Sequence, residues 1–224
     1  MNEVLGEYRR LLTDVDTWFR GCIARLGEKI RCVEGCSECC RGLFDITLLD
    51  AALLKDGFDR LDAATREQVL ARCRERLAGM RRLWPDFAHP YLLNSRPEEE
   101  WEILMPDDDE TPCPLLGEDG RCLVYEFRPM TCRLHGLPLV DLTGEVLHDE
   151  WCTLNYVDGD PLTDAELRGE FTRIFQEEVR LFRRFSAELL GREFRELDTF
   201  IPTALLVDFA RFDWRRFAAD CATP

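Results

Sequence analysis

Eight of the eleven cysteines in this chain fall into two blocks whose composition suits metal binding. The first block is a nine-residue segment that contains Cys32, Cys36, Cys39 and Cys40. The second block is more widely spaced and contains Cys113, Cys122, Cys132 and Cys152. Thiolates are soft ligands that zinc and iron–sulfur centres favour, whereas disulfides are rare in a reducing compartment. The sequence therefore predicts that these eight thiols are metal ligands.

The adjacent pair Cys39 and Cys40 is the most informative part of this pattern. Neighbouring side chains of an extended segment point to opposite sides, so the two sulfurs are poorly placed to bind one ion together. Two neighbouring metal ions, or one cluster with several metals, would use both sulfurs. The eight cysteines then form either two four-thiolate sites or one polynuclear centre, and the sequence leaves both arrangements open.

The spacing of the cysteines also bears on which metal is bound. A structural zinc site usually has cysteine pairs separated by about two to four residues, and Cys36-Ser-Glu-Cys39 fits that pattern. Eight residues separate Cys113 from Cys122 and nine separate Cys122 from Cys132, which is much longer. The longer spacing and the adjacent pair favour an iron–sulfur cluster or a polynuclear iron centre, with zinc as the alternative.

The other three cysteines are expected to bind nothing. Cys22 and Cys73 fall on the apolar faces of expected helices, where a thiol packs as a small hydrophobic group. Cys221 lies close to the C-terminus, where ligand positions are poorly fixed.

Several side chains around Cys132 are candidates for tuning or completing the centre. Arg128 and Arg133 could lower the pKa of nearby thiols or pair with the acidic segment that precedes the second block. Tyr125 could donate a hydrogen bond to a sulfur or only pack its ring. His135 follows Cys132 by three residues and is a candidate ninth ligand.

The remaining histidines and the acidic runs are expected to be exposed. His89 lies in a proline-rich segment and His148 in a strand-like one. The run of acidic residues over 107–110 lacks the alternation of a calcium loop, so a solvated stretch is the expectation.

The composition argues against a nucleic-acid partner and against a membrane protein. The 224 residues include 44 acidic and 29 basic ones, which gives a net charge of −15. No apolar stretch approaches the roughly 20 residues that span a bilayer, and the first residues lack the features of a signal peptide. We therefore expect a cytoplasmic protein whose partners are metal ions and a protein or peptide.

Helical patterns are expected on both sides of the cysteine-rich segment. Apolar residues recur at helical spacing over residues 3–30 and 63–83, and Thr47 is a plausible cap for a short helix starting near residue 45. Thr163-Asp-Ala-Glu166 predicts a capping box for a helix that ends near Gly191. A further helix, rich in Phe and Trp, is expected over 203–219.

The segments between these helices are expected to be irregular or to form hairpins. Residues 85–112 contain prolines and acidic runs typical of a connector. Turn residues predict one small hairpin over 113–122 and a second between 137–141 and 144–148. The predicted fold is a single, mainly α domain over 1–224, with helical layers around a loop-rich, metal-stapled core and two short β-hairpins. The cysteine-cluster core is 30–156, the N-terminal helix 3–30 and the C-terminal helical part 163–219.

At these residues the chain resembles the zinc- or iron-chelating CxxCxxCC family of cysteine-cluster proteins. The resemblance covers roughly residues 30–156 and rests on the cysteines and their neighbours. The matching segments are Cys32, Cys36, Cys39-Cys40, Cys113-Pro-Leu-Leu, Gly120-Arg-Cys122-Leu-Val-Tyr125, Arg128-Pro-Met-Thr-Cys132-Arg133 and Trp151-Cys152-Thr-Leu-Asn155. Three residues separate the first two cysteines, one more than the family's motif has. The resemblance implies a zinc or iron–sulfur centre. The family also includes flagellin lysine N-methylases, but this chain has no Gly-rich nucleotide loop to support that activity.

Two functions of different classes follow from a cysteine-ligated centre. In the first, the centre is chemically active, in an oxidoreductase, an electron carrier or a cluster-dependent modifying enzyme. Such a centre needs an open coordination position, or a cluster near solvent beside a pocket. In the second, the metal is a structural zinc staple in a scaffold or partner-binding module, with every ligand position filled by cysteine.

Overall fold

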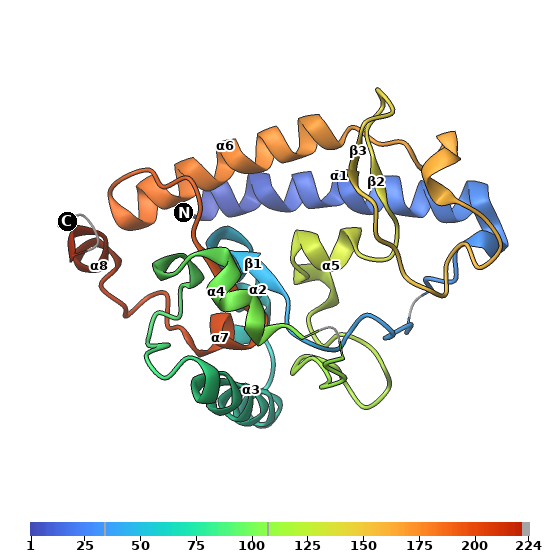
Figure 1. Ribbon diagram of the computed structural model, residues 1–224. Helices are drawn as coiled ribbons and strands as arrows, with labels where there is room; N and C mark the ends of the chain where they lie inside the picture. Colours follow the sequence, from blue (N-terminus) through green and yellow to red (C-terminus); the bar gives the residue numbers. More distant parts are fainter. Residues whose placement is uncertain (34, 107, 221–224) are drawn as a thin grey trace.

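Two long antiparallel helices form one layer of the protein (Figure 1). The computed structural model describes residues 1–33, 35–106 and 108–220. The two helices are α1, Asn2–Leu26, and α6, Phe171–Leu190, and a 3-10 turn at Gly27–Lys29 follows α1. Apolar side chains at helical spacing are buried on both, among them Leu12 and Val15 of α1 and Leu181 and Phe185 of α6. The N-terminal helix predicted from the sequence is therefore confirmed.

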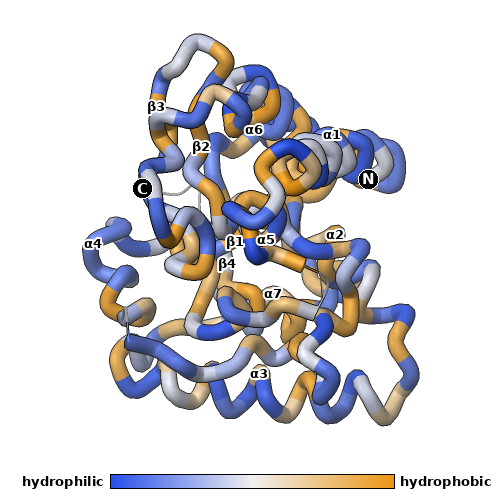
Figure 2. The backbone as a smooth tube through the Cα atoms, turned by 90° about the vertical axis from the view of Figure 1, so that its right-hand side faces the viewer, coloured by the Kyte–Doolittle hydropathy of each residue, from blue (hydrophilic) through white to orange (hydrophobic). Residues whose placement is uncertain are grey.

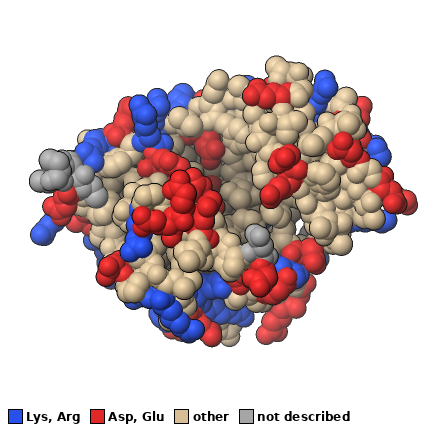
Figure 3. Space-filling model, viewed as in Figure 1, with Lys and Arg blue, Asp and Glu red and all other residues tan. Residues whose placement is uncertain are grey.

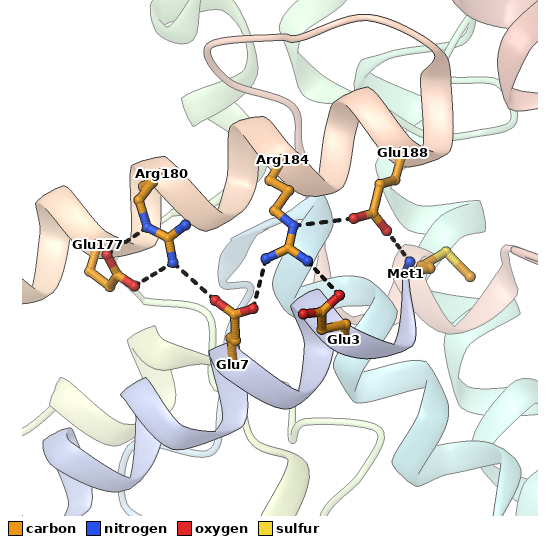
Figure 4. A network of polar contacts seen from close by, with 7 residues as sticks. All are labelled: Met1, Glu3, Glu7, Glu177, Arg180, Arg184 and Glu188. Atoms are coloured by element: carbon orange, nitrogen blue, oxygen red, sulfur yellow. Dashed lines mark hydrogen bonds and ion pairs between the residues drawn. The ribbon is translucent and has the colours of Figure 1, made fainter.

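A network of ion pairs holds the outer edges of α1 and α6 together (Figure 4). The Arg184 guanidinium lies 2.7 Å from the Glu7 carboxylate and 2.8 Å from that of Glu3. Arg180 continues the network to Glu7 at 3.0 Å, and Glu188 pairs with the amino group of Met1. The residue numbers rise along α1 as they fall along α6, so these contacts match the antiparallel register in which the two apolar faces pack.

A second group of helices lies on the other side of the molecule. It consists of α2, Leu48–Asp59, α3, Ala63–Leu83, and α7, Ile201–Leu206. The backbone N–H of Asp50 donates to the Thr47 hydroxyl at 3.1 Å, which confirms Thr47 as a helix cap. The bounds of α3 are those that the sequence predicts, and Cys73 and Leu77 are buried on its inner face. Figure 2 shows α2, α7 and the short helix α5, Met130–Leu134, between the layer of α1 and α6 and the outer helix α3.

Two short antiparallel sheets complete the fold. In one, β1, Asp45–Thr47, pairs with β4, Asp198–Phe200. In the other, β2, Leu139–Val140, pairs with β3, Val146–His148, around a turn at Gly144, whose φ of 90° favours glycine. The β2–β3 hairpin confirms the strand pair predicted over 137–148. The β1–β4 pair was not predicted, because residues 45–47 read as the start of a helix and their partner is far away in the sequence.

The remaining helices are short. They are α4, Glu98–Trp101, α5, Met130–Leu134, α8, Trp214–Asp220, and the 3-10 turns Leu93–Ser95, Glu102–Leu104, Tyr125–Phe127, Pro161–Thr163 and Ala165–Leu167. None of the helices in the described ranges is long and apolar enough to cross a membrane.

Two of the predicted helical segments differ from the structure. The capping box at Thr163 does not start the long helix, because the Asp164 carboxylate accepts from the Glu166 N–H within a 3-10 turn and α6 begins only at Phe171. The helix expected over 203–219 is split into α7 and α8. Between them, the Asp208 carboxylate accepts from the backbone N–H of Ala210 and Arg211 at 3.1 Å, which closes a turn.

Candidate metal centre

The end of the first cysteine block pairs with the start of the second through the backbone. The N–H of Cys113 donates to the carbonyl of Cys40 at 2.9 Å, and the N–H of Gly42 donates to Thr111 at the same distance. Arg41 and Pro112 form an antiparallel bridge between these bonds. Figure 1 shows the two segments side by side beneath α5. The two distant blocks are thus brought together, as metal binding by both would require.

The segment between Cys113 and Cys122 folds back on itself. The N–H of Gly117 donates to the carbonyl of Arg121 at 2.8 Å, and that of Leu123 donates to Leu115 at 2.9 Å. Leu116 and Cys122 form an antiparallel bridge. The predicted hairpin is therefore present as a tight loop with one bridge, and it returns the chain toward Cys113.

Cys132 reaches the same neighbourhood from α5. Besides burial, the charges of Cys113, Cys122 and Cys39 raise the pKa of the Cys132 thiol. A hydrogen bond with Cys39 lowers the pKa of the Cys40 thiol, and the charges of Cys113, Cys132 and Cys122 oppose that lowering. We call these residues the five-thiol group: Cys39, Cys40, Cys113, Cys122 and Cys132.

Burial keeps most of this group protonated. Loss of water around the thiol raises the pKa of Cys132 well above its ordinary value and that of Cys113 to about 12. The Cys39 thiol donates a hydrogen bond to the Cys40 sulfur, which raises the pKa of Cys39 and lowers that of Cys40. Several thiolates can be accommodated here only with a positive partner, and a metal ion would supply that charge.

Two arginines stand beside the five-thiol group. Arg128 favours the thiolate forms of Cys39, Cys122 and Cys132 by its charge. Arg133, which is 6% exposed, donates to the carbonyls of Arg128 at 3.0 Å and Glu126 at 2.9 Å.

The carboxylate that pairs with both arginines belongs to Asp16 of α1, and not to the acidic connector that the sequence suggested. Arg133 thereby fastens the turn before Cys132 to α1. The Tyr125 ring packs against the Arg128 guanidinium, with 3.6 Å from the guanidinium carbon to the ring centre.

The other three predicted ligands form a neighbouring group. Cys32 is acted on by Cys152 and Cys36, and also by Cys39 of the five-thiol group. Burial raises the pKa of Cys32, and a hydrogen bond with Asn155 opposes that shift. We call Cys32, Cys36 and Cys152 the three-thiol group. The charge of Cys39 also raises the pKa of Cys32 in the three-thiol group and that of Cys132 in the five-thiol group. The vicinal pair Cys39–Cys40 therefore lies where the two thiol groups meet.

The thiols are close without being arranged around a metal. Among residues 1–33, 35–106 and 108–220, no three His, Cys, Asp or Glu side chains form a group that could hold an ion as placed. The ten cysteines of those ranges are all free thiols. Binding would therefore draw the sulfurs closer together, which the side-chain rotamers of cysteine allow.

Cys22 and Cys73 are fully buried, as expected for packing residues. Loss of water raises the pKa of Cys22 to about 11 and that of Cys73 to about 12. Cys221 lies outside the described residues.

The histidines and acidic residues have other contacts. His135 is exposed and lies edge-on to Phe44, with 5.3 Å between ring centres. His148 is on the exposed strand β3, and the exposed His89 packs against Phe212 at 4.6 Å. Asp109 pairs with Arg76 of α3 and accepts from the Thr111 N–H at 3.0 Å, so it orders the segment before Cys113. Asp107 lies outside the described residues.

No pattern in the sequence indicates a role for three residues that contact the candidate ligands or the arginines beside them. Asn155 bonds to Cys32, Gly136 packs against the same sulfur, and Asp16 pairs with both arginines. Among the three, only Asn155 lies in a segment that resembles the family, as the last residue of Trp151-Cys152-Thr-Leu-Asn155. No motif pointed to Gly136 or Asp16, because their role depends on contacts with residues far away in the sequence.

Comparison with known proteins agrees with this picture of the centre. The profile of the CxxCxxCC family, described as "Putative zinc- or iron-chelating domain", matches residues 31–153, which is more than half of the chain. No curated protein and no solved structure has a significant match to the chain. The matched range contains all the cysteines of both thiol groups. The chain therefore belongs to the CxxCxxCC family of zinc- or iron-chelating domains.

Proposed function

We propose that this protein carries an iron–sulfur or polynuclear iron centre ligated by Cys32, Cys36, Cys39, Cys40, Cys113, Cys122, Cys132 and Cys152. The observation that carries the proposal is the convergence of four chain segments on the vicinal pair Cys39–Cys40. The backbone bond between Cys40 and Cys113 joins the two blocks, and Cys39 acts on thiols of both groups.

The donor set fits such a centre. Sulfur ligands suit iron–sulfur clusters and zinc alike, and the thiols are desolvated, which favours charge compensation by a cation. A single structural zinc ion uses four ligands. The five-thiol group already exceeds that number, and a second group adjoins it, which favours more than one metal.

A pocket next to Cys113 supports a chemically active centre. It has a volume of about 770 Å³ and is lined by Met80 of α3, by Leu104 of the 3-10 turn Glu102–Leu104, and by Pro114 and Leu116 of the loop after Cys113. Cys113 is part of its wall. A cluster beside such a pocket is placed to exchange electrons with a bound partner or to support a modification reaction. A cytoplasmic location accords with eight reduced thiols.

The alternative is a zinc staple in a scaffold or partner-binding module. The observation that favours it is the antiparallel bridge at Arg41 and Pro112, since a metal beside it would lock two distant segments. In that case each ion would have four cysteine ligands and no open position.

Purification without oxygen, followed by metal and inorganic sulfide analysis, decides between these functions. We expect iron, sulfide and a broad visible absorption that bleaches on reduction. Zinc without sulfide in a colourless protein would reject the cluster and support the staple. A protein that contains neither metal, and takes up neither after reduction, would refute metal binding.

A further inference from the structure

A buried amide side chain lies against one of the candidate ligands. Asn155 is 1% exposed, and its Nδ2 donates to the Gly136 carbonyl at 2.6 Å and to the Cys32 sulfur at 3.3 Å. Its Oδ1 accepts from the backbone N–H of Arg31 at 2.7 Å. A carbonyl on one side and an N–H on the other fix which end of the amide carries the hydrogens.

The same turn brings Cys152 to Cys32. The N–H of Asn155 donates to the Cys152 carbonyl at 2.9 Å, and the N–H of Cys152 donates to Gly136 at 3.2 Å. Gly136 has a φ of 107°, and a Cβ built on it would lie 3.2 Å from the Cys32 sulfur and 3.8 Å from the Cys152 Cβ. The two cysteines therefore converge where Gly136 has no side chain.

We propose that Asn155 is a positioning residue that holds Cys32 as a metal ligand of the three-thiol group. The inference rests on the proposed function of metal binding, and Asn155 itself lies beyond the residues that the family profile matches. When Cys32 binds a metal it loses its proton, so the weak contact from its thiol to Oδ1 at 3.8 Å disappears. The contact from Nδ2 to the sulfur needs no proton on Cys32 and is kept.

The chemistry of the site explains why an amide is suited to it. Both N–H groups of Nδ2 have an acceptor, and Oδ1 has a donor, so the side chain is fixed by its own contacts. Hydrogen bonds from residues around a metal site orient its ligands, and their removal typically costs about 10–100-fold in metal affinity. An aspartate of the same size would keep the bond from Arg31 but turn an acceptor toward the thiolate.

The test compares Asn155→Ala and Asn155→Asp in the natural sequence and in a Cys32→Ala background. Each protein is purified without oxygen with the metal it carries, and the rate of metal loss to an excess of chelator is followed by elemental analysis. In the natural background we expect both substitutions to speed the loss of part of the metal by about 10–100-fold. In the Cys32→Ala background we expect no further change, and the metal of the five-thiol group should remain.

Asn94→Ala is the matched control, because Asn94 also forms an amide bridge, to Asp198. It should leave metal loss unchanged. The inference is overturned if the Asn155 substitutions change nothing, or if they speed metal loss equally in both backgrounds, since the residue would then act on the fold alone. It is also overturned if Cys32→Ala removes all metal. A natural protein without metal would reject the proposed function itself, which is a different result from a metal-bound protein that is indifferent to Asn155.

Discussion

At the scale of single residues, the vicinal thiols Cys39 and Cys40 share one hydrogen bond and lie between the two thiol groups. The proton of the Cys39 thiol is directed at the Cys40 sulfur, and this bond lowers the pKa of Cys40 and raises that of Cys39. A metal that binds one sulfur displaces that proton and leaves the other free to bind a second metal. We therefore expect both sulfurs of the pair to bind metal, so that the pair connects the two thiol groups.

Substitution of Cys40 tests this role directly. We expect Cys40→Ser to lower metal affinity by more than the roughly 10–100-fold typical of residues around a ligand, because it removes a ligand. Cys22→Ser is the control, since Cys22 is a buried thiol of α1 whose apolar cluster includes Cys32 but none of the five-thiol group. Elemental analysis of both variants measures the effect. Equal metal contents in Cys40→Ser and the natural protein would show that Cys40 is no ligand.

A second residue-scale prediction concerns the buried carboxyl group of Asp198. Loss of water raises its pKa to about 7, from about 4 in the unfolded chain. The folded state therefore binds the proton more tightly, so the free energy of unfolding should fall by a few kcal/mol as the pH rises from about 4 to 7. Burial also raises the pKa of Asp50 and Glu178, which act in the same direction.

Asp198→Asn should flatten this dependence and make the protein more stable than its parent near pH 8. Urea unfolding at several pH values measures it, and the comparison of variant with parent at each pH cancels the effect of protons on metal binding. The exposed Glu99→Gln serves as control. Parallel curves for Asp198→Asn and the parent would contradict the prediction.

At the scale of elements, α2 supports the turn that leads to Cys132. A Cβ built on Gly57 of α2 would lie 2.4 Å from Cγ of Phe127, in the 3-10 turn just before Arg128. The missing side chain thus lets the ring pack against the helix. Helix α2 and the second cysteine block are coupled at this point, although neither position carries a metal ligand.

Two Gly→Ala substitutions distinguish the effect of this contact on stability from the effect of helix propensity. Gly57→Ala should destabilise the protein by about 1–3 kcal/mol through overpacking and should speed metal loss by displacing the turn. Gly79→Ala in α3, where nothing lies within 4 Å of the added Cβ, should instead stabilise it by about 0.5–1 kcal/mol. Urea unfolding measures both, and a stabilising Gly57→Ala would refute the packing argument.

At the scale of the whole molecule, an acidic surface encloses an apolar core in which helices far apart in the sequence pack together. Figure 3 shows Asp and Glu in several patches across one face, with Lys and Arg mostly around its rim, including the lower edge over α3. The large apolar core joins α1 and α6 to α2, α7 and α8. The second cysteine block adds Leu115, Val124 and Met130 to this core, whereas the chain around Cys36 and Cys40 is held mainly by turns and the single bridge at Arg41.

For this reason, removal of the metal should loosen the cysteine-bearing loops more than the long helices. We expect chelator treatment to increase amide hydrogen exchange at Gly42, Cys113 and Leu123, whose N–H groups form the loop contacts. The buried turns of α1 and α6 should keep their protection. Exchange measured by mass spectrometry before and after treatment tests this, and a uniform loss of protection would show that the metal supports the whole fold.

The sequence revealed the local features and missed those that depend on distant contacts. The spacing of apolar residues gave α1 and α3, and the turn residues at Gly144 gave the β2–β3 hairpin. The start of α6 was wrong because Asp164 caps a turn of its own. The strand pair β1–β4 and the pairing of Asp16 with Arg133 join residues far apart in the chain, and no local pattern encodes them.

The pairing of β1 with β4 has a consequence for the order of events on the ribosome. All eight candidate ligands precede β4 in the chain, while β1 sits just after the first cysteine block. During synthesis, a full set of thiols is therefore present before β1 has its partner strand. Metal delivered at that stage would meet the complete set of candidate ligands while β1 is still unpaired, so the β1–β4 pair is expected to form only after these thiols are available.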